Sequence, residues 1–178
     1  MHLVFGRRAL LADDMGLGKT VQAIAASAML KELRGIKQVL VICPASLKHQ
    51  WEREIRRFTS LSVVVIGGKK SERKKLYTDP AFFKIINYEL IRFDDDELSR
   101  QRFDLVILDE LTYMIAFDYL SEKEILEAIV SRPKNQSVVV TGRGGGSQLQ
   151  DIMDTVSEVR EVKHAYRAGV KARQGVDY

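Results

Sequence analysis

The chain has 178 residues, of which 46% are hydrophobic, and this is enough for one α/β domain with a buried core. No run of about 18 apolar residues occurs, so the sequence predicts no membrane-spanning helix. The beginning of the chain lacks an apolar leader, which favours a cytoplasmic protein. The single cysteine, Cys43, excludes an internal disulfide, and with only three histidines the composition argues against a structural zinc site.

The net charge of +4 is unevenly distributed. Residues 1–103 contain 19 Lys and Arg against 12 Asp and Glu, whereas residues 104–178 contain 9 against 12. A basic first part favours a nucleic-acid partner, although ordinary solvated helix faces account for the same charges. The helix predicted at 69–77 carries five of these cations, namely Lys69, Lys70, Arg73, Lys74 and Lys75.

Apolar strands alternate with helices along the chain. Strands are predicted at 2–12, 38–43, 62–66, 84–88, 103–111, 137–141 and, at an edge, 159–162. Helices are predicted at 21–33 with Gly35 as C-cap, 46–58 with Ser46 as N-cap, 69–77, 122–130 and 148–156, and an acidic helix start at 94–97. This alternation predicts a single α/β domain over residues 1–178, with a mainly parallel sheet covered on both faces.

The stretch 10–20 combines a strand end, a glycine loop and the first turn of a helix. Glycines let the backbone approach an anion, and the helix N-terminus points at the same place. Lys19 supplies a cation for the β and γ phosphates, and the Thr20 hydroxyl can hold Mg²⁺. Asp13 replaces the first glycine of the usual motif, and a strand–helix turn without a ligand is the alternative. The predicted ATP contacts are Asp14, Met15, Gly16, Leu17, Gly18, Lys19, Thr20 and Val21.

An acidic pair, Asp109 and Glu110, follows four apolar residues and has the form of a Walker B strand end. Asp109 is predicted to hold Mg²⁺ together with Thr20, and Glu110 to orient or deprotonate a water molecule. Arg143 follows the strand predicted at 137–141, where it is either a sensor of the γ-phosphate or a surface arginine. All these groups follow carboxyl ends of strands, where α/β sheets bind their ligands.

The first part of the chain resembles the first RecA-like lobe of Swi/Snf-type ATPases, within the superfamily 2 helicases. The resemblance covers about residues 3–110 and rests on residues 11–22, on 41–47 with Trp51, and on 86–89. In that family an Asp in place of the first glycine is normal. The resemblance implies a three-layer α/β/α P-loop NTPase fold, with the strand at 137–141 lying between the strands that precede the phosphate loop and Asp109.

The second part resembles the back half of the P-loop corrinoid adenosyltransferases, which move adenosine from ATP to cobalt. This resemblance runs from about residue 104 to the last residue, and includes 109–113, 118–120, 141–144, 154–158 and 162–165. It begins where the charge changes sign. Together the two resemblances imply a chimera, engineered or recombined, that is joined near the strand before Asp109.

Three functions remain open from the sequence. The first is a domain that binds Mg-ATP, or phosphate or sulfate alone, with weak or no hydrolysis. The helicase resemblance implies that hydrolysis depends on an arginine finger from a second lobe, and the sequence shows no such lobe. The second is corrinoid adenosyltransfer, and the third is weak, salt-sensitive binding of nucleic acid by a helicase-like lobe. The sequence leaves open whether the chain is a monomer or a dimer.

Overall fold

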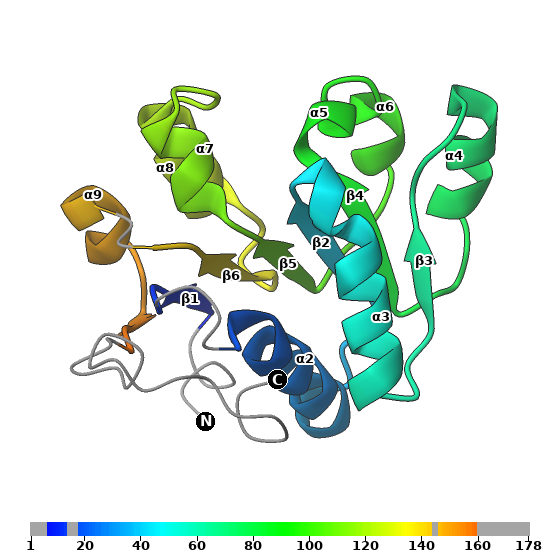
Figure 1. Ribbon diagram of the computed structural model, residues 1–178, viewed down its shortest axis with the longest axis horizontal. Coiled ribbons are helices and arrows are strands. Elements are labelled where there is room, and N and C mark those ends of the chain that lie inside the picture. The colour runs from blue at the N-terminus through cyan, green and yellow to red at the C-terminus, as the bar shows by residue number, and fades with distance from the viewer. Residues whose placement is uncertain (1–6, 14–17, 144–145, 160–178) are drawn as a thin grey trace, which may run out of the picture.

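The computed structural model describes residues 7–13, 18–143 and 146–159, and these form a seven-stranded parallel sheet (Figure 1). The order across the sheet is β3-β4-β2-β5-β6-β1-β7. The strand at 137–141 therefore lies between the strands before the phosphate loop and before Asp109, as predicted. The strands are β1 (Arg8–Leu11), β2 (Val39–Cys43), β3 (Val63–Val65), β4 (Phe83–Asn87), β5 (Leu105–Leu108), β6 (Ser137–Thr141) and β7 (Thr155–Ser157).

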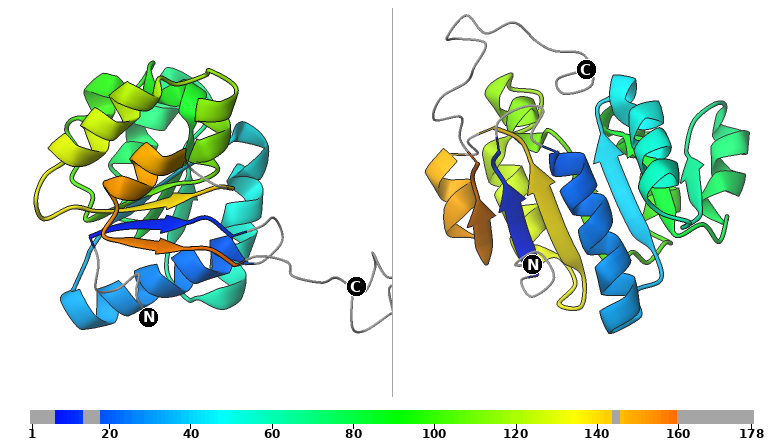
Figure 2. Two further views of the ribbon diagram at one scale, coloured as in Figure 1. Left: turned by 90° about the vertical axis from the view of Figure 1, so that its left-hand side faces the viewer. Right: turned by 60° about the horizontal axis from the view of Figure 1, so that its bottom comes forward.

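Helices cover both faces of this sheet, which confirms the three-layer α/β/α arrangement (Figure 2). The longest, α2, ends as predicted at Gly35, which has a φ of 65° and donates its N–H to Lys31 O at 2.9 Å. The described helices are α2 (Lys19–Arg34), the 3₁₀ turn η1 (Ala45–Leu47), α3 (Lys48–Phe58), α4 (Lys70–Tyr77), α5 (Tyr88–Ile91), α6 (Asp95–Leu98), α7 (Leu111–Ala116), α8 (Glu122–Ser131) and α9 (Gly146–Asp151). None of them is long and apolar enough to cross a membrane.

Alternate residues of the strands pack in different hydrophobic clusters, because successive side chains of a strand point to opposite faces. Val39, Val41 and Cys43 pack with α2 and α3 on one face. Leu40 and Ile42 pack on the other face with Tyr77 of α4 and with the short helices that follow. Nearly continuous apolar strands are what a sheet buried on both faces requires.

The two parts of the chain that differ in charge interleave in the sheet. The strands β3, β4 and β2 precede residue 104, β5 and β6 follow it, and β1 of the first part then lies between β6 and β7 of the second. Leu10 of β1 packs in one cluster with Val138 and Val140 of β6 and with Ile125 of α8. A hydrophobic core built from both parts follows directly from this strand order.

Two local predictions are wrong, and a third, the edge strand at 159–162, falls mostly outside the described residues. Ser46 does not cap a helix, because Pro44 starts a 3₁₀ turn closed by Leu47 N to Pro44 O at 2.9 Å, and α3 begins at Lys48. The helix predicted at 148–156 begins at Gly146 and ends at Asp151, because residues 155–157 pair with β1 as strand β7. Val159 lies beyond that edge strand, and residues 160–162 lie outside the described part.

The basic helix α4 presents fewer cations than its sequence indicates. Arg73 is buried, and its Nε and Nη2 atoms donate to the two oxygens of Asp94, each at 2.6 Å. Asp94 is the N-cap residue of α6 but makes no capping bond with its side chain, so its charge serves Arg73 rather than the helix. Arg73 is therefore removed from any surface that could meet nucleic acid, which corrects the prediction for this residue.

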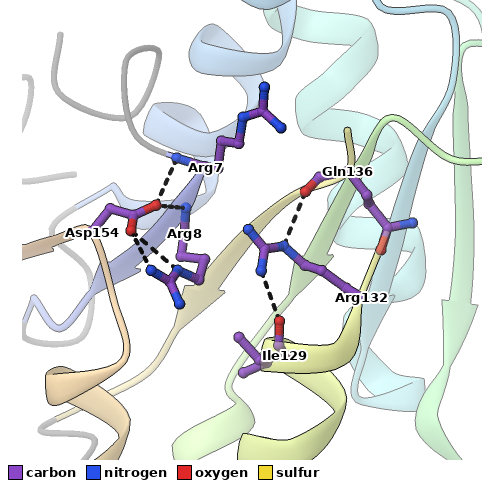
Figure 3. A network of polar contacts seen from close by, with 6 residues as sticks. All are labelled: Arg7, Arg8, Ile129, Arg132, Gln136 and Asp154. Atoms are coloured by element: carbon purple, nitrogen blue, oxygen red, sulfur yellow. Dashed lines mark hydrogen bonds and ion pairs between the residues drawn. The ribbon is translucent and has the colours of Figure 1, made fainter. Parts of the chain in front are cut away.

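A second carboxylate ties β1 to the segment before β7 (Figure 3). Asp154 Oδ2 accepts the backbone N–H groups of Arg7 at 3.0 Å and Arg8 at 2.9 Å, and Oδ1 accepts Arg8 Nη2 at 2.6 Å. Hydrogen bonds from Arg8 hold the pKa of the Asp154 carboxyl below its ordinary value. Nearby, the Arg132 guanidinium donates to Ile129 O and Gln136 O at the end of α8.

Replacing Asp154 by asparagine is expected to cost about 1 kcal/mol of stability at pH 7, because the pair is one third exposed and screened by water. A carboxyl whose pKa is lowered by folding stabilises the protein above its unfolded pKa of about 4, and this contribution disappears as the pH falls further. Urea unfolding of wild type and Asp154→Asn at pH 7, 5, 4 and 3 should show their difference closing below pH 4. A difference that stays constant down to pH 3 would refute the role of this charge.

Candidate functional site

The predicted site residues that the structure describes, apart from Arg143, meet at one edge of the sheet. Residues 18–20 follow β1, Asp109 and Glu110 follow β5, and Thr141 ends β6. The register pairs Leu11 with Thr141 and Leu108 with Val140, so these three strands end together. Carboxyl ends of parallel strands at a reversal of strand order are the usual position of ligand sites in such folds.

The described end of the predicted phosphate loop is compatible with the predicted motif. Gly18 has a φ of 81°, in the left-handed region that favours glycine, and α2 begins at the next residue. Lys19 is buried, and its Nζ atom donates to Asp13 O at 2.9 Å and lies 3.8 Å from Glu110 Oε1. The predicted contacts Asp14, Met15, Gly16 and Leu17 lie outside the described residues.

Asp13 has a structural role in the loop. It is fully buried, and its Oδ2 atom accepts Gln22 Nε2 while its Oδ1 atom accepts Val159 N, both at 2.9 Å. The carboxylate thus joins the start of the loop to α2 and to the chain that follows β7. An aspartate at the first-glycine position is consistent with these contacts.

Asp109 is held by hydrogen bonds on both carboxylate oxygens. Trp51 Nε1 of α3 donates to Oδ2 at 2.8 Å, and Thr141 Oγ1 donates to Oδ1 at 2.7 Å. The residue is only 4% exposed. Burial raises the pKa of this carboxyl, while the hydrogen bonds from Trp51 and Thr141 and the charge of Lys19 lower it.

Glu110 occupies an unusual backbone position. Its φ of 53° lies in the left-handed region, and α7 begins at the next residue. A non-glycine residue in this region costs free energy and is common at functional sites. Its N–H donates to Thr141 Oγ1 at 3.0 Å, so Thr141 binds both acidic residues. Burial raises the pKa of the Glu110 carboxyl, and the charge of Lys19 opposes this shift.

A pocket of about 330 Å³ lies over these groups. The loop side of the wall includes Thr20 and Val21, and the strand side includes Asp109 and Glu110. The third side is closed by side chains that were not predicted, namely Leu47 of η1 and Gln50 and Glu54 of α3. Arg143 is exposed and does not line this pocket, so its role as a phosphate sensor stays a prediction.

The pocket suits a magnesium ion that arrives with a nucleotide. Magnesium is usually held by one or two carboxylates together with phosphate oxygens and water. Thr20 and Asp109 line the same pocket, and each Asp109 oxygen retains a lone pair beyond its one hydrogen bond. No cluster of three or more His, Cys, Asp or Glu that could hold a resident metal occurs among the described residues.

The fold and the placement of these residues define a P-loop NTPase-like domain. The chain belongs to the ATP:corrinoid adenosyltransferase BtuR/CobO/CobP family, whose model matches residues 16–178. It is 56% identical over 75 residues to corrinoid adenosyltransferase CobA of Salmonella typhimurium, which is 42% of this chain and 38% of that protein. It is 52% identical over 81 residues to the corrinoid adenosyltransferase of Escherichia coli K12, which is 46% of this chain and 41% of that protein. The chain thus spans about two fifths of these enzymes.

A second similarity is to helicase-like ATPases. The chain is 38% identical over 119 residues to chromatin-remodeling ATPase INO80 of Sclerotinia sclerotiorum, which is 59% of this chain and 7% of that protein. Among solved structures, the Pyrococcus furiosus Hef helicase domain matches 93% of this chain and 37% of its own, with a TM-score of 0.70 and 21% identity. The Sulfolobus solfataricus SWI2/SNF2 ATPase core in complex with dsDNA matches 86% of this chain and 32% of its own, with a TM-score of 0.64 and 23% identity. Both resemblances seen in the sequence are confirmed, and they are consistent with a chimera.

Sequence reasoning missed the residues that position the acidic pair. The sequence indicates Trp51 only as part of a family resemblance, and Thr141 only as the strand end before Arg143. An indole and a hydroxyl carry no local signal of their partners, because the partners lie 58 and 32 residues away in sequence. A threonine at the end of the strand beside β5 was the one usable clue.

Proposed function

We propose that the chain binds Mg-ATP in the pocket between α2, α3 and the end of β5, and that it hydrolyses ATP weakly or not at all. One observation carries this proposal: Lys19, Thr20, Asp109 and Glu110, which are distant in sequence, line a single pocket. A lysine cation, a hydroxyl and a carboxylate at one helix N-terminus are the groups that a nucleotide triphosphate with magnesium needs.

Each residue has a separate role in this proposal. Residues 14–18 and the N-terminus of α2 would contact the phosphates, and Lys19 Nζ would exchange its contact with Asp13 O for a phosphate oxygen. Thr20 and Asp109 would hold Mg²⁺, which would supply positive charge against the phosphates. Glu110 orients a water molecule, and its contact with Lys19 at 3.8 Å keeps its carboxylate directed into the pocket.

We expect slow hydrolysis because the described lining of the pocket lacks an arginine. In helicase-like and GTPase sites an arginine finger increases the rate by roughly 10³–10⁵. Among the described residues, those that line the pocket include no arginine. Phosphate or sulfate alone could occupy the loop, because the described pocket wall presents no aromatic side chain for a base.

We propose further that residues 1–178 form one domain that arose by recombination, natural or engineered, of a helicase-like and an adenosyltransferase-like segment near β5. The charge difference between residues 1–103 and 104–178 supports this origin, as do the two sets of relatives. A join at β5 is physically reasonable if both parents place a parallel strand in that position, because β5 of this chain pairs in parallel with β2 of the first part and β6 of the second.

Replacing Lys19 by alanine is expected to weaken Mg-ATP binding by roughly 10- to 100-fold, since a charge-assisted hydrogen bond contributes about 1.5–3 kcal/mol. Isothermal titration calorimetry of wild type and Lys19→Ala measures this difference. Lys31→Ala is the matched control, because Lys31 is an exposed lysine in the last turn of the same helix. Equal affinity in wild type and Lys19→Ala would refute the site, and no binding to the wild type would refute the function.

Corrinoid adenosyltransfer is the second candidate, and membership of that family favours it. The activity transfers the adenosyl group of ATP to the cobalt of a reduced corrinoid. Mixing the chain with ATP and a chemically reduced corrinoid should then produce the spectrum of the adenosylated product, with Lys19→Ala as the inactive control. Retained Mg-ATP binding without that spectrum would leave only the first candidate.

A further inference from the structure

The contact between Trp51 and Asp109 joins two elements that neither sequence pattern connects. Trp51 lies on α3 in the first part of the chain, is 1% exposed, and is the only tryptophan of the chain. Its indole N–H donates to Asp109 Oδ2 at 2.8 Å. A buried indole N–H needs an acceptor, and here that acceptor is a carboxylate that lines the nucleotide pocket.

We infer that Trp51 is a positioning residue for the magnesium-binding carboxylate of the proposed Mg-ATP site. The inference rests on the proposed function for its consequence and on the observed contact for its geometry. With Thr141 on Oδ1 at 2.7 Å and Trp51 on Oδ2 at 2.8 Å, rotation of the carboxylate about its Cβ–Cγ bond breaks both hydrogen bonds. The plane of the carboxylate is therefore fixed before a metal arrives.

The helix that carries Trp51 also forms the wall of the pocket. Gln50 precedes Trp51, Glu54 follows it by one turn, and both line the pocket beside Asp109. On the sheet side, Trp51 and Ile55 pack into the core that α2 shares with β2 and β5. Because this packing holds α3 against the sheet, the indole N–H reaches Asp109 from a rigid element rather than from a loop.

Partners of this kind, which orient a metal ligand without touching the metal, typically contribute 10- to 100-fold to metal affinity. Trp51→Phe removes the N–H donor and keeps most of the aromatic volume. Tyr88→Phe is the matched control, because the Tyr88 hydroxyl donates to the backbone oxygen of Asp109 at 3.0 Å and leaves the carboxylate untouched.

The geometric half of the inference can be tested without nucleotide. Since the chain has one tryptophan, a ¹⁵N-labelled sample gives one indole N–H signal. We expect this signal to exchange slowly with solvent, to shift in Asp109→Ala and Asp109→Asn, and to stay in place in Tyr88→Phe. An indole signal that exchanges freely, or that ignores both Asp109 variants, overturns the inference whether or not the chain binds ATP.

The functional half is measured as the ratio of ATP affinities with Mg²⁺ and with EDTA. Trp51→Phe should lower this ratio by roughly tenfold and leave the EDTA affinity nearly unchanged, while Tyr88→Phe should keep the wild-type ratio. A loss of equal size with and without Mg²⁺ would mean that Trp51 only supports folding, and overturns the inference. If the wild type binds no ATP, the affinity for Mn²⁺ alone is measured instead, by paramagnetic broadening of the spectrum. Trp51→Phe should lower this affinity by roughly tenfold, and Tyr88→Phe should keep the wild-type value. Equal Mn²⁺ affinity in wild type and Trp51→Phe overturns the inference.

Discussion

Replacing Asp94 by alanine is expected to lower the free energy of unfolding by about 3–5 kcal/mol, because it leaves a buried guanidinium without its counter-charge. Asp94 is 2% exposed and Arg73 is 8% exposed. The two residues share a bidentate pair of hydrogen bonds at 2.6 Å, and the Tyr77 hydroxyl adds a third bond to Asp94 at 3.0 Å. Removal of the carboxylate therefore breaks three contacts that the protein excludes from water.

Urea unfolding at neutral pH measures this effect. Lys74→Ala is a suitable control, since Lys74 lies next to Arg73 and its side chain, which pairs with Glu97 at 3.6 Å, is 66% exposed. That control should change stability by less than about 1 kcal/mol. A loss in Asp94→Ala no larger than in Lys74→Ala would mean that the buried pair contributes nothing beyond a surface pair.

Replacing Leu10 by alanine is expected to lower the free energy of unfolding by about 2–5 kcal/mol and to destabilise both parts of the chain together. Leu10 is completely buried, although it belongs to the first part of the chain. Its described neighbours in the cluster come mostly from the second part, and they include Val138, Val140, Ile125 and Leu149. A cavity at this position removes contacts between the two parts rather than within one of them.

If residues 1–178 form one domain, the wild type and Leu10→Ala should each unfold in one cooperative transition, followed by circular dichroism and by Trp51 fluorescence. Trp51 reports on the first part of the chain. In the sheet, β5 pairs with β2 of that part and β6 pairs with β1. Leu33→Ala is the control, because Leu33 is 64% exposed. Separate transitions of the two probes would contradict the single-domain proposal.

Much of the architecture could be predicted from local patterns. Apolar runs such as Val39–Cys43 and Ser137–Thr141 are strands with nearly the predicted bounds, and the helix after the phosphate loop ends at Gly35 as expected. These elements are determined by residues close in sequence. The short helices α5 and α7 were not predicted, because four to six residues hold too little periodicity to separate a helix from a loop.

Two of the errors have the same physical cause, which is that the deciding partner is distant in sequence. Arg73 was read as part of a basic surface because its acceptor, Asp94, lies 21 residues away. The predicted helix at 148–156 includes Thr155 and Val156, because their pairing with β1 involves the beginning of the chain. Local spacing gives no information about such contacts.

For the candidate site, the sequence predicted residues that the fold brings to one pocket, and it missed the residues that position the acidic pair. Lys19, Thr20, Val21, Asp109 and Glu110 line one pocket. The hydrogen bonds of Trp51 and Thr141 to Asp109, and the contacts of Asp13, required the fold. Arg143 remains a prediction, since the pocket that holds the other residues does not include it.

The most direct measurement of the central claim is a crystal structure of the chain with Mg²⁺ and a non-hydrolysable ATP analogue. The account predicts phosphate density at the N-terminus of α2 within hydrogen-bond reach of Lys19 Nζ, and a magnesium ion between the phosphates and the side chains of Thr20 and Asp109. Nucleotide bound instead in the hollow between the far ends of α2 and α3, which Met29, Leu33 and Phe58 line, would contradict it.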